Sequence, residues 1–412
     1  MTAIQKIEAR EILDSRGNPT IEATVYTVNF KATASVPAGA STGVHEAKEL
    51  RDGGPRYLGL GVSKSVKIIQ QKISPQLKGV EVTDQGKIDN LMLKLDGHDD
   101  KSKLGANSIL AVSLACARAG ANSQKIQLFK YLNNYLTQIS GSSRPIKLPR
   151  MYFNIINGGA HADNKLSFQE FLISPNLNSA SKNIQAASEI YHTLKKIMQK
   201  KGLTTNLGDE GGFAPVKLKK TTEVLDLLVK AVKEAGYGNK CSLALDAAAS
   251  QFYHRGKYLI DGRRLSSSEL LGYYLSLVRK YPLSSIEDPF QQEDFAMFAQ
   301  LKKKSGIQIV GDDLTVTNQE RIQAAIYEDS CNCLLLKVNQ IGTLTEALSA
   351  ADLAFKNGWQ VMVSHRSGET EDTFIADLAV ALGCGMIKAG APCRGERTAK
   401  YNRLLKIEND LI

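Results

Sequence analysis

The pattern of hydrophobic and polar positions changes between residues 135 and 145, which divides the chain into two parts. Before this point, strand-like runs come first and helical patterns follow, an order that predicts an α+β domain. We therefore expect a smaller N-terminal α+β domain over residues 1–135 and a polar linker over 136–144. The predicted strands lie at 4–13 and 20–34, around a turn signal at 15–19, and the predicted helices at 63–77, 84–95 and 105–121.

After residue 145, short apolar runs alternate with amphipathic stretches of 12 to 20 residues. This alternation is typical of βα units, in which helices cover a parallel sheet. The number of units fits a (β/α)8 barrel over residues 145–412, which is close to the usual size of that fold. The predicted strands are 241–245, 283–286, 307–310, 333–336, 359–363 and 385–387, and the predicted helices are 266–280, 294–303, 318–327, 343–356 and 370–382.

Charged or titratable side chains follow six of the apolar runs. In a barrel, these side chains would extend from the carboxyl ends of the strands into one mouth, where barrel active sites lie. A single charge of this kind is more often a structural ion pair. Six in succession indicate a function, because buried like charges are unfavourable unless something neutralises them. The side chains are Asp246, Glu287, Asp312, Lys337, His365 with Arg366, and Lys388.

Three of these groups are carboxylates without a neighbouring cysteine or a paired histidine. Asp246, Glu287 and Asp312 favour Mg²⁺ or another hard divalent cation over zinc. Lys337 and Lys388 share the predicted mouth, and a lysine near another cation loses proton affinity and can act as a base. The residues thus predict a metal-dependent enzyme that removes a proton from a weak acid, with an arginine available for phosphate or carboxylate.

Glycine-rich loops at 157–161 and 208–212 are either tight turns or places where the backbone approaches a ligand. Glu170 and Glu210, which belong to these regions, could form a pair in which one carboxyl stays protonated and serves as a general acid. The small-residue loop 37–43 is either a plain linker or a lid that supplies oxygen ligands when it closes.

Charge, hydropathy and cysteine content limit which binding partners and which cellular compartment are expected. The net charge is +10, but the basic clusters are scattered and no aromatic-studded RNA-binding motif accompanies them, so no nucleic acid is expected. Polar residues interrupt the apolar stretch 104–121, and charges interrupt the N-terminal segment, so neither a membrane span nor a secretory signal is expected. The six cysteines are too sparse for a disulfide scaffold, which favours a reduced, cytoplasmic compartment.

Motifs along the whole chain resemble those of the enolase family. The resemblance implies a C-terminal TIM-like barrel of the enolase type and a lyase that dehydrates 2-phosphoglycerate reversibly to phosphoenolpyruvate in glycolysis and gluconeogenesis. It also implies two Mg²⁺ ions per site and a homodimer, with an octamer as the alternative. The matching motifs include DSRGNPT (14–20), GASTG (39–43), NIINGGAHADNKLSFQEF (154–171), GDEGGFAP (208–215), SIEDPF (285–290), GDDLTVTN (311–318), LLLKVNQIG (334–342) and SHRSGETED (364–372).

The resemblance also implies a role for each residue of the mouth. Lys337 would be the base that takes the C2 proton, and Glu210 the acid that assists loss of the 3-hydroxyl. The metal ligands would be Asp246, Glu287 and Asp312 for the first Mg²⁺ and Ser41 for the second. Arg366 and Ser367 would bind the phosphate. The substrate-binding residues as a whole would be His161, Gln169, Glu170, Glu287, Asp312, Lys337, His365, Arg366, Ser367 and Lys388.

Ala38, Ala389 and Gly395 depart from the usual family residues beside the site, and we expect that they could lower activity. Two alternatives stay open at this point. One is another enzyme of the same superfamily, such as a cycloisomerase or epimerase, although these lack the SHRSGETED motif. The other is a binding protein that has kept the fold and lost catalysis. Loss of Lys337, Glu210 or a metal carboxylate would indicate the latter, and all of them are present.

Overall fold

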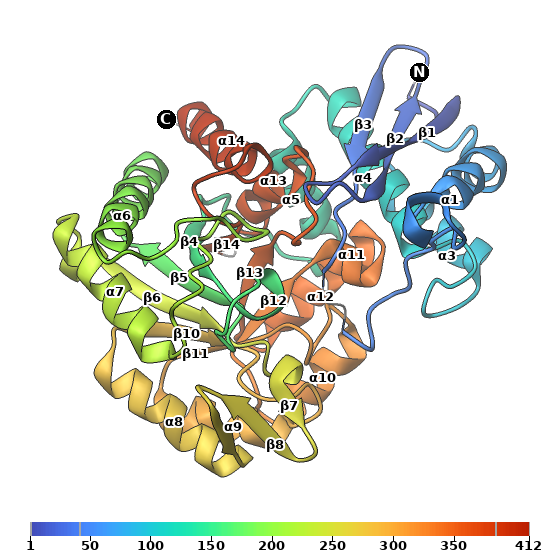
Figure 1. Ribbon diagram of the computed structural model, residues 1–412. Helices are drawn as coiled ribbons and strands as arrows, with labels where there is room; N and C mark the ends of the chain where they lie inside the picture. Colours follow the sequence, from blue (N-terminus) through green and yellow to red (C-terminus); the bar gives the residue numbers. More distant parts are fainter. Residues whose placement is uncertain (1, 41–42, 384, 412) are drawn as a thin grey trace.

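The computed structural model describes residues 2–40, 43–383 and 385–411 (Figure 1). An antiparallel three-stranded sheet and a set of helices lie to one side of a closed barrel that is surrounded by helices (Figure 1). The N-terminal elements are β1 (Lys6–Leu13), β2 (Pro19–Tyr26), β3 (Lys31–Ser35), η1 (Arg56–Gly59), α1 (Ser63–Ile68), the π-helical turn η2 (Ile69–Ile73), α2 (Ser74–Leu77), α3 (Gln85–Asp96), α4 (Ala106–Ser123) and α5 (Leu128–Ser140).

Two features of this N-terminal part differ from the predicted pattern. The run 20–34 is not one strand, because a turn in which the Thr27 amide donates to the Phe30 carbonyl separates β2 from β3. Helix α5 was not predicted, and it makes residues 136–140 of the expected linker helical. Residues 141–149 then connect α5 to the first barrel strand, and the domain boundaries themselves stay a prediction.

The barrel closes in the order β10-β11-β12-β13-β14-β4-β5-β6 within the described chain. Its strands are β4 (Arg150–Asn157), β5 (Glu170–Pro175), β6 (Cys241–Asp246), β10 (Leu283–Glu287), β11 (Gln308–Gly311), β12 (Cys333–Leu336), β13 (Gln360–Ser364) and β14 (Gly385–Lys388). The helices that follow β5 are α6 (Ala180–Lys200), α7 (Thr221–Glu234), α8 (Ser267–Lys280), α9 (Phe295–Ser305), α10 (Gln319–Tyr327), α11 (Val338–Ile341), α12 (Leu344–Lys356), α13 (Phe374–Leu382) and α14 (Gly395–Leu411).

The simple βα pattern predicted a uniformly parallel barrel, but one strand of the observed barrel runs in the opposite direction. Strand β5 pairs antiparallel with both β4 and β6, whereas every other neighbouring pair in the barrel is parallel. The connection from β4 to β5 contains only the short helix η3 (Gly159–His161), too little for a parallel crossover. A small sheet of β7 (Tyr253–His254), β8 (Lys257–Ile260) and β9 (Arg263–Leu265) lies between β6 and α8.

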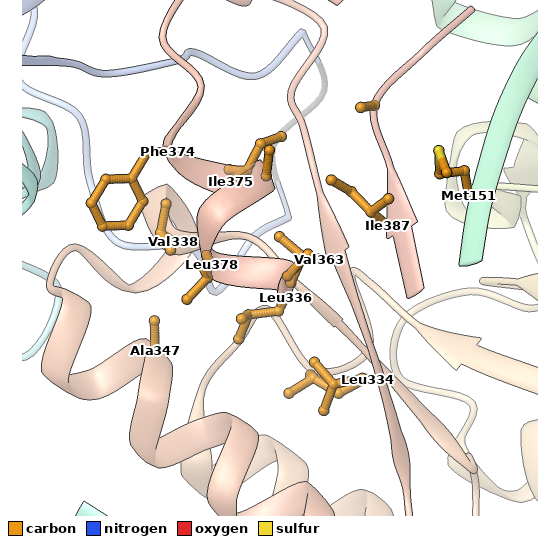
Figure 2. Packing of buried hydrophobic residues seen from close by; sticks show 14 of the residues in the cluster. Met151, Leu334, Leu336, Val338, Ala347, Val363, Phe374, Ile375, Leu378 and Ile387 are labelled. Carbon is orange, nitrogen blue, oxygen red and sulfur yellow. The ribbon is translucent and has the colours of Figure 1, made fainter. Parts of the chain in front are cut away.

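Side chains alternate along the barrel strands between two buried environments. Leu334 and Leu336 of β12, Val363 of β13 and Ile387 of β14 point outward and pack with Leu378 of α13, as Figure 2 shows. The residues between them point inward and form a separate core, which is the packed layer expected in a barrel. This interior layer consists of Tyr152, Leu172, Ala244, Val310, Cys333, Leu335, Met362 and Met386.

None of the helices in the described ranges combines the length and the hydropathy needed to cross a membrane. The described cysteines have free thiols, and most are buried; they are Cys116, Cys241, Cys331, Cys333 and Cys393.

Candidate active site

The candidate site is the next inward-facing layer of the barrel. On seven strands, counting two residues from the apolar interior toward the mouth reaches a polar side chain, because alternate strand residues share a face. On β10, Glu287 lies two residues beyond the buried Ser285. On β5 the count runs backwards, since that strand is antiparallel, and Glu170 therefore lies at the mouth although it begins its strand. The layer consists of Asn154, Glu170, Asp246, Glu287, Asp312, Lys337, Ser364 and Lys388.

Lys388 forms the centre of one ionic cluster. Its Nζ lies 2.8 Å from Glu287 Oε2, 3.2 Å from Asp246 Oδ2 and 3.3 Å from Glu170 Oε2, and its side chain is 2% exposed. Burial lowers the pKa of Lys388, but these carboxylates outweigh burial and raise the pKa well above its usual range. The same surroundings raise the pKa of Glu287 through burial and the charge of Asp246.

Lys337 forms a second ion pair with Asp312, with Nζ and Oδ2 2.5 Å apart. Gln340 Nε2 donates to the other oxygen of Asp312 over 2.9 Å. Burial lowers the pKa of Lys337, but the Asp312 charge more than compensates, and the pKa is raised. The Lys388 charge does act to lower the pKa of Lys337, as predicted, but the Asp312 charge outweighs it and the net pKa is not depressed.

Glu170 and Glu210 form the predicted carboxyl pair around His161. His161 Nδ1 lies 3.6 Å from Glu210 Oε1 and 3.9 Å from Glu170 Oε1. Burial and the Glu210 charge raise the pKa of Glu170 well above its usual range. Burial also acts to raise the pKa of Glu210, but His161 and His365 outweigh it and the pKa is lowered. The surroundings thus shift the pKa values of the two carboxyls in opposite directions.

The two glycine-rich loops explain why these groups meet. A Cβ on Gly208 would lie 2.7 Å from Asn157 Cβ and from the His161 carbonyl, and one on Gly212 would lie 2.6 Å from Asn157 Oδ1. Such approaches are too short for any side chain, so both positions require glycine. The close packing of loop 208–212 on loop 157–161 brings Glu210 beside His161.

Arg366 is the candidate anion-binding group, and it is buried. Its terminal nitrogens form a two-point ion pair with Glu46, at 3.0 and 3.1 Å, and Nη1 also donates to Asn339 Oδ1 over 2.8 Å. Next to it, Ser367 Oγ lies 3.1 Å from His161 Nε2 and donates to Glu210 Oε1 over 3.2 Å. The N-terminal part of the chain thus supplies Glu46 to the barrel mouth.

The predicted site residues within the described chain come together at the mouth, including Gln169, whose amide donates to the Asp246 carbonyl over 3.1 Å. Ser41 lies outside the described residues. Sequence reasoning missed Asn154, which donates to Glu210 Oε2 over 2.9 Å, although the two-residue alternation from Tyr152 could have located it. It also missed Glu46, for which no local signal exists because its partner is far away in sequence.

Oxygen donors in this layer fit a hard divalent cation. Asp246 and Glu287 converge on Lys388 Nζ, whereas the Asp312 carboxylate lies with those of Asp288 and Asp313, whose oxygens are within 4.8 Å of one another. Burial and the Asp246 charge raise the pKa of Glu287, and a cation would relieve both effects. Within the described part of the chain, the side-chain oxygen Oε1 of Gln169 and Nδ1 of His161 are buried without a hydrogen-bond partner, as expected where a ligand binds.

Comparison with known proteins decides the family. A family model described as "Enolase, C-terminal TIM barrel domain" matches residues 145–412, and one described as "Enolase, N-terminal domain" matches residues 4–132. The chain belongs to the enolase family. It is 54% identical over 412 residues to the enolase of Methanocaldococcus jannaschii, a match that covers 99% of this chain and 95% of that protein.

Membership in the enolase family confirms the predicted family, the barrel fold with a smaller N-terminal domain, and the prediction of a lyase. The atypical residue Ala38 now has a structural context. Its backbone forms a two-way bridge with Gly368, over 2.8 and 2.9 Å, so this contact does not depend on the Ala38 side chain.

Proposed function

We propose that the chain catalyses the reversible, Mg²⁺-dependent dehydration of 2-phosphoglycerate to phosphoenolpyruvate. The observation that carries this proposal is the polar layer at the barrel mouth, in which the buried Lys388 and the partly exposed Lys337 face four carboxylates. This layer offers a base and a cation site, and the buried Arg366, which follows the layer residue Ser364 by two positions, offers an anion-binding group. Full-length similarity to an enolase supports the choice of reaction.

Asp246, Glu287 and Asp312 would hold the first Mg²⁺, because they are the oxygen donors of this layer nearest the two lysines. When bound, Mg²⁺ would stabilise the negative charge that develops on the substrate carboxylate. A second Mg²⁺ with Ser41 as a ligand is proposed from the family resemblance, since Ser41 lies outside the described residues.

Lys337 would be the base that takes the C2 proton, for which it must be the neutral amine. A cation held by Asp312 would offset the carboxylate charge that raises the Lys337 pKa in the ion pair. Lys337 follows β12 at the mouth, and its side chain is 13% exposed, so substrate can reach it from solvent. Glu210 would assist departure of the 3-hydroxyl from the opposite part of the pocket, where Asn154 and Ser367 hold both of its oxygens. Placing base and acid on different elements suits the removal of groups from two adjacent carbons.

Arg366 and Ser367 would bind the phosphate, and His161, Gln169, Glu170, His365 and Lys388 would complete the pocket. Arginine suits a phosphate because its planar donors match two oxygens at once. Asn339 and Glu46 fix the plane of the Arg366 guanidinium before substrate arrives. Such preorganisation lowers the entropy lost on binding.

We also propose a homodimer, with an octamer as the alternative, and a cytoplasmic location. Family membership supports the homodimer, and the free thiols of the described cysteines support a reducing compartment. Light scattering coupled to size-exclusion chromatography measures the oligomeric state. A mass near 44.9 kDa at micromolar concentration would contradict the homodimer.

The direct test follows the ultraviolet absorbance of phosphoenolpyruvate formed from 2-phosphoglycerate. We expect the protein to be active with Mg²⁺, to lose activity after prolonged EDTA treatment, and to recover activity when Mg²⁺ is returned. Absence of product with Mg²⁺ would contradict the proposed reaction. Full turnover by the chelated protein would contradict the role given to the carboxylates.

A further inference from the structure

Behind the proposed pocket lies a buried guanidinium that the reaction scheme does not use. Arg397 belongs to α14 and is 0% exposed. Its Nη1 lies 2.6 Å from His365 Nδ1 and donates to the Arg366 carbonyl over 2.6 Å. Its Nη2 donates to the Ser367 carbonyl over 2.5 Å and to the Asp209 carbonyl over 3.2 Å. One side chain therefore contacts three successive residues of the pocket and the residue before Glu210.

The contact with His365 fixes where the imidazole proton resides. A guanidinium stays protonated in proteins, and all its nitrogens are donors without acceptor capacity. His365 Nδ1 must therefore accept, which leaves the imidazole proton on Nε2. That nitrogen lies 3.5 Å from Glu210 Oε2.

A doubly protonated His365 would place a second donor and a second positive charge against Arg397. Burial and the Arg397 charge lower the pKa of His365 to about 4, although Glu210 and Glu369 act in the opposite direction. The neutral imidazole is thus the form that this environment stabilises at neutral pH.

We propose that Arg397 is a positioning residue that holds His365 in the neutral tautomer with its proton on Nε2, the nitrogen 3.5 Å from Glu210 Oε2. The same guanidinium fixes the carbonyls of Arg366 and Ser367, so the orientation of the imidazole and the course of the anion-binding segment depend on one group. Arg397 acts through His365 and touches no reacting atom. This inference deepens the proposed function and rests on it for the role of the pocket.

The first test measures the tautomer in the wild-type protein without substrate. Protein labelled with ¹⁵N-histidine is examined by long-range ¹H–¹⁵N correlation at pH 7.5, and His365→Gln identifies the His365 signals by their loss. The expected pattern is an unprotonated Nδ1 and a protonated Nε2 for His365. A protonated Nδ1, or an imidazolium, would overturn the proposal whether or not the protein dehydrates 2-phosphoglycerate.

The second test compares Arg397→Met, Arg397→Lys and the control Arg403→Met. Arg403 lies on the same helix and pairs with Asp377 through bonds of 2.6 and 2.8 Å, so its loss removes an arginine contact without touching His365. Arg397→Met should raise the pKa of His365 and lower kcat about 10–100-fold, the range for lost partners behind functional imidazoles. Arg397→Lys, which keeps a cationic donor, should restore the neutral form and part of kcat.

Two outcomes of the second test would overturn the proposal. One is an unchanged His365 tautomer and pKa in Arg397→Met, and the other is a fall in kcat no larger than in Arg403→Met. Should Arg397→Met fail to fold, the wild-type tautomer measurement decides the matter alone. Failure of the proposed function would show separately, as absent turnover in a wild-type protein whose His365 has the expected tautomer.

Discussion

Two carboxyl groups in the pocket have pKa values shifted in opposite directions although they are equally buried. Glu170 and Glu210 are both about 2% exposed, yet the pKa of Glu170 is raised and that of Glu210 is lowered. The difference arises because His161, His365 and Arg397 surround Glu210, whereas Glu170 faces the Glu210 charge and the acidic side of the Lys388 cluster. Substitution of each carboxyl in turn therefore tests which of the two delivers the proton to the departing 3-hydroxyl.

Glu210→Gln should lower the rate of dehydration about 10²–10⁴-fold, the usual range for loss of a general acid. Exchange of the C2 hydrogen in heavy water should survive at a much larger fraction of its normal rate, because Lys337 remains. Both rates are measured on one preparation, with Glu170→Gln as the matched control. If Glu170→Gln shows the selective loss of dehydration instead, the acid is Glu170 and the role given to Glu210 is wrong.

Lys337→Ala should reduce C2-hydrogen exchange by about 10²–10⁴-fold while circular dichroism stays unchanged. The side chain lies at the barrel mouth and not in the apolar core, so its removal leaves the packing intact. The control is Lys356→Ala, which removes an exposed ion pair with Asp352 on α12 and should leave the exchange rate as it was. Exchange at the normal rate in Lys337→Ala would show that another group is the base.

At the scale of elements, two segments from opposite ends of the chain meet over the mouth. The Ser15 amide donates to the Glu369 carbonyl over 2.7 Å, and Ala38 and Gly368 exchange backbone hydrogen bonds. A Cβ on Gly368 would lie 2.8 Å from the Ala38 carbonyl oxygen, a contact that backbone cannot relieve without moving. The DSRGNPT and SHRSGETED motifs are thus two halves of one junction.

Gly368→Ala should push these segments apart and lower kcat/KM about 100-fold, because displacement of about 1 Å at a catalytic site has an effect of this size. The matched control is Gly272→Ala in the middle of α8, where nothing lies within 4 Å of the added Cβ. That change should raise the free energy of unfolding by about 0.5–1 kcal/mol and leave activity unchanged. Unaltered kcat/KM in Gly368→Ala would show that the junction does not position the site.

On the scale of the whole molecule, a cation should stabilise the fold as well as serve the reaction. Binding to the folded state alone adds about 2.7 kcal/mol at a ligand concentration 100 times Kd. We therefore expect Mg²⁺ without substrate to raise Tm in calorimetry after EDTA treatment, and Asp246→Asn to abolish most of the rise. An equal rise in both proteins would place the stabilising cation elsewhere.

The N-terminal part and the barrel are joined by a partly buried ion pair whose strength depends on pH. Arg118 of α4 binds both oxygens of Asp372 over 2.6 and 2.7 Å, and the Ser35 amide of β3 donates to the same carboxylate over 2.9 Å. Burial acts to raise the pKa of Asp372, but Arg118 outweighs it and the pKa is lowered. The pair therefore stabilises the protein above the unfolded pKa and is lost as pH falls through the lower folded pKa.

Asp372→Asn should lower the free energy of unfolding by about 2–4 kcal/mol at pH 7, somewhat less than for a fully buried pair because Arg118 is partly exposed. The difference between variant and wild type should shrink as pH falls below about 4, where the wild-type carboxylate also takes up a proton. Denaturant unfolding at both pH values measures this, and a difference that stays constant with pH would contradict the electrostatic explanation.

The sequence predicted which strand segments are buried, because the burial of a segment depends mainly on the residues next to it in the chain. The charged residue that follows each apolar run located Asp246, Lys337 and Lys388 at one mouth, and the structure places them there. Motif resemblance identified the family for the same reason, since the motifs are contiguous. The chain order of strands and helices also predicted the barrel, apart from the direction of β5.

Only the tertiary structure decided what depends on contacts between distant segments. The reversal of β5 places Glu170 at the mouth, Glu46 reaches Arg366 across the two parts of the chain, and Arg397 reaches His365 from the last helix. The net direction of a pKa shift depends on contacts of this kind, because the Asp312 charge outweighs the lowering of the Lys337 pKa that Lys388 causes. Burial pattern is a property of the local sequence, whereas the electrostatic environment of a buried charge is set by the groups that folding brings around it.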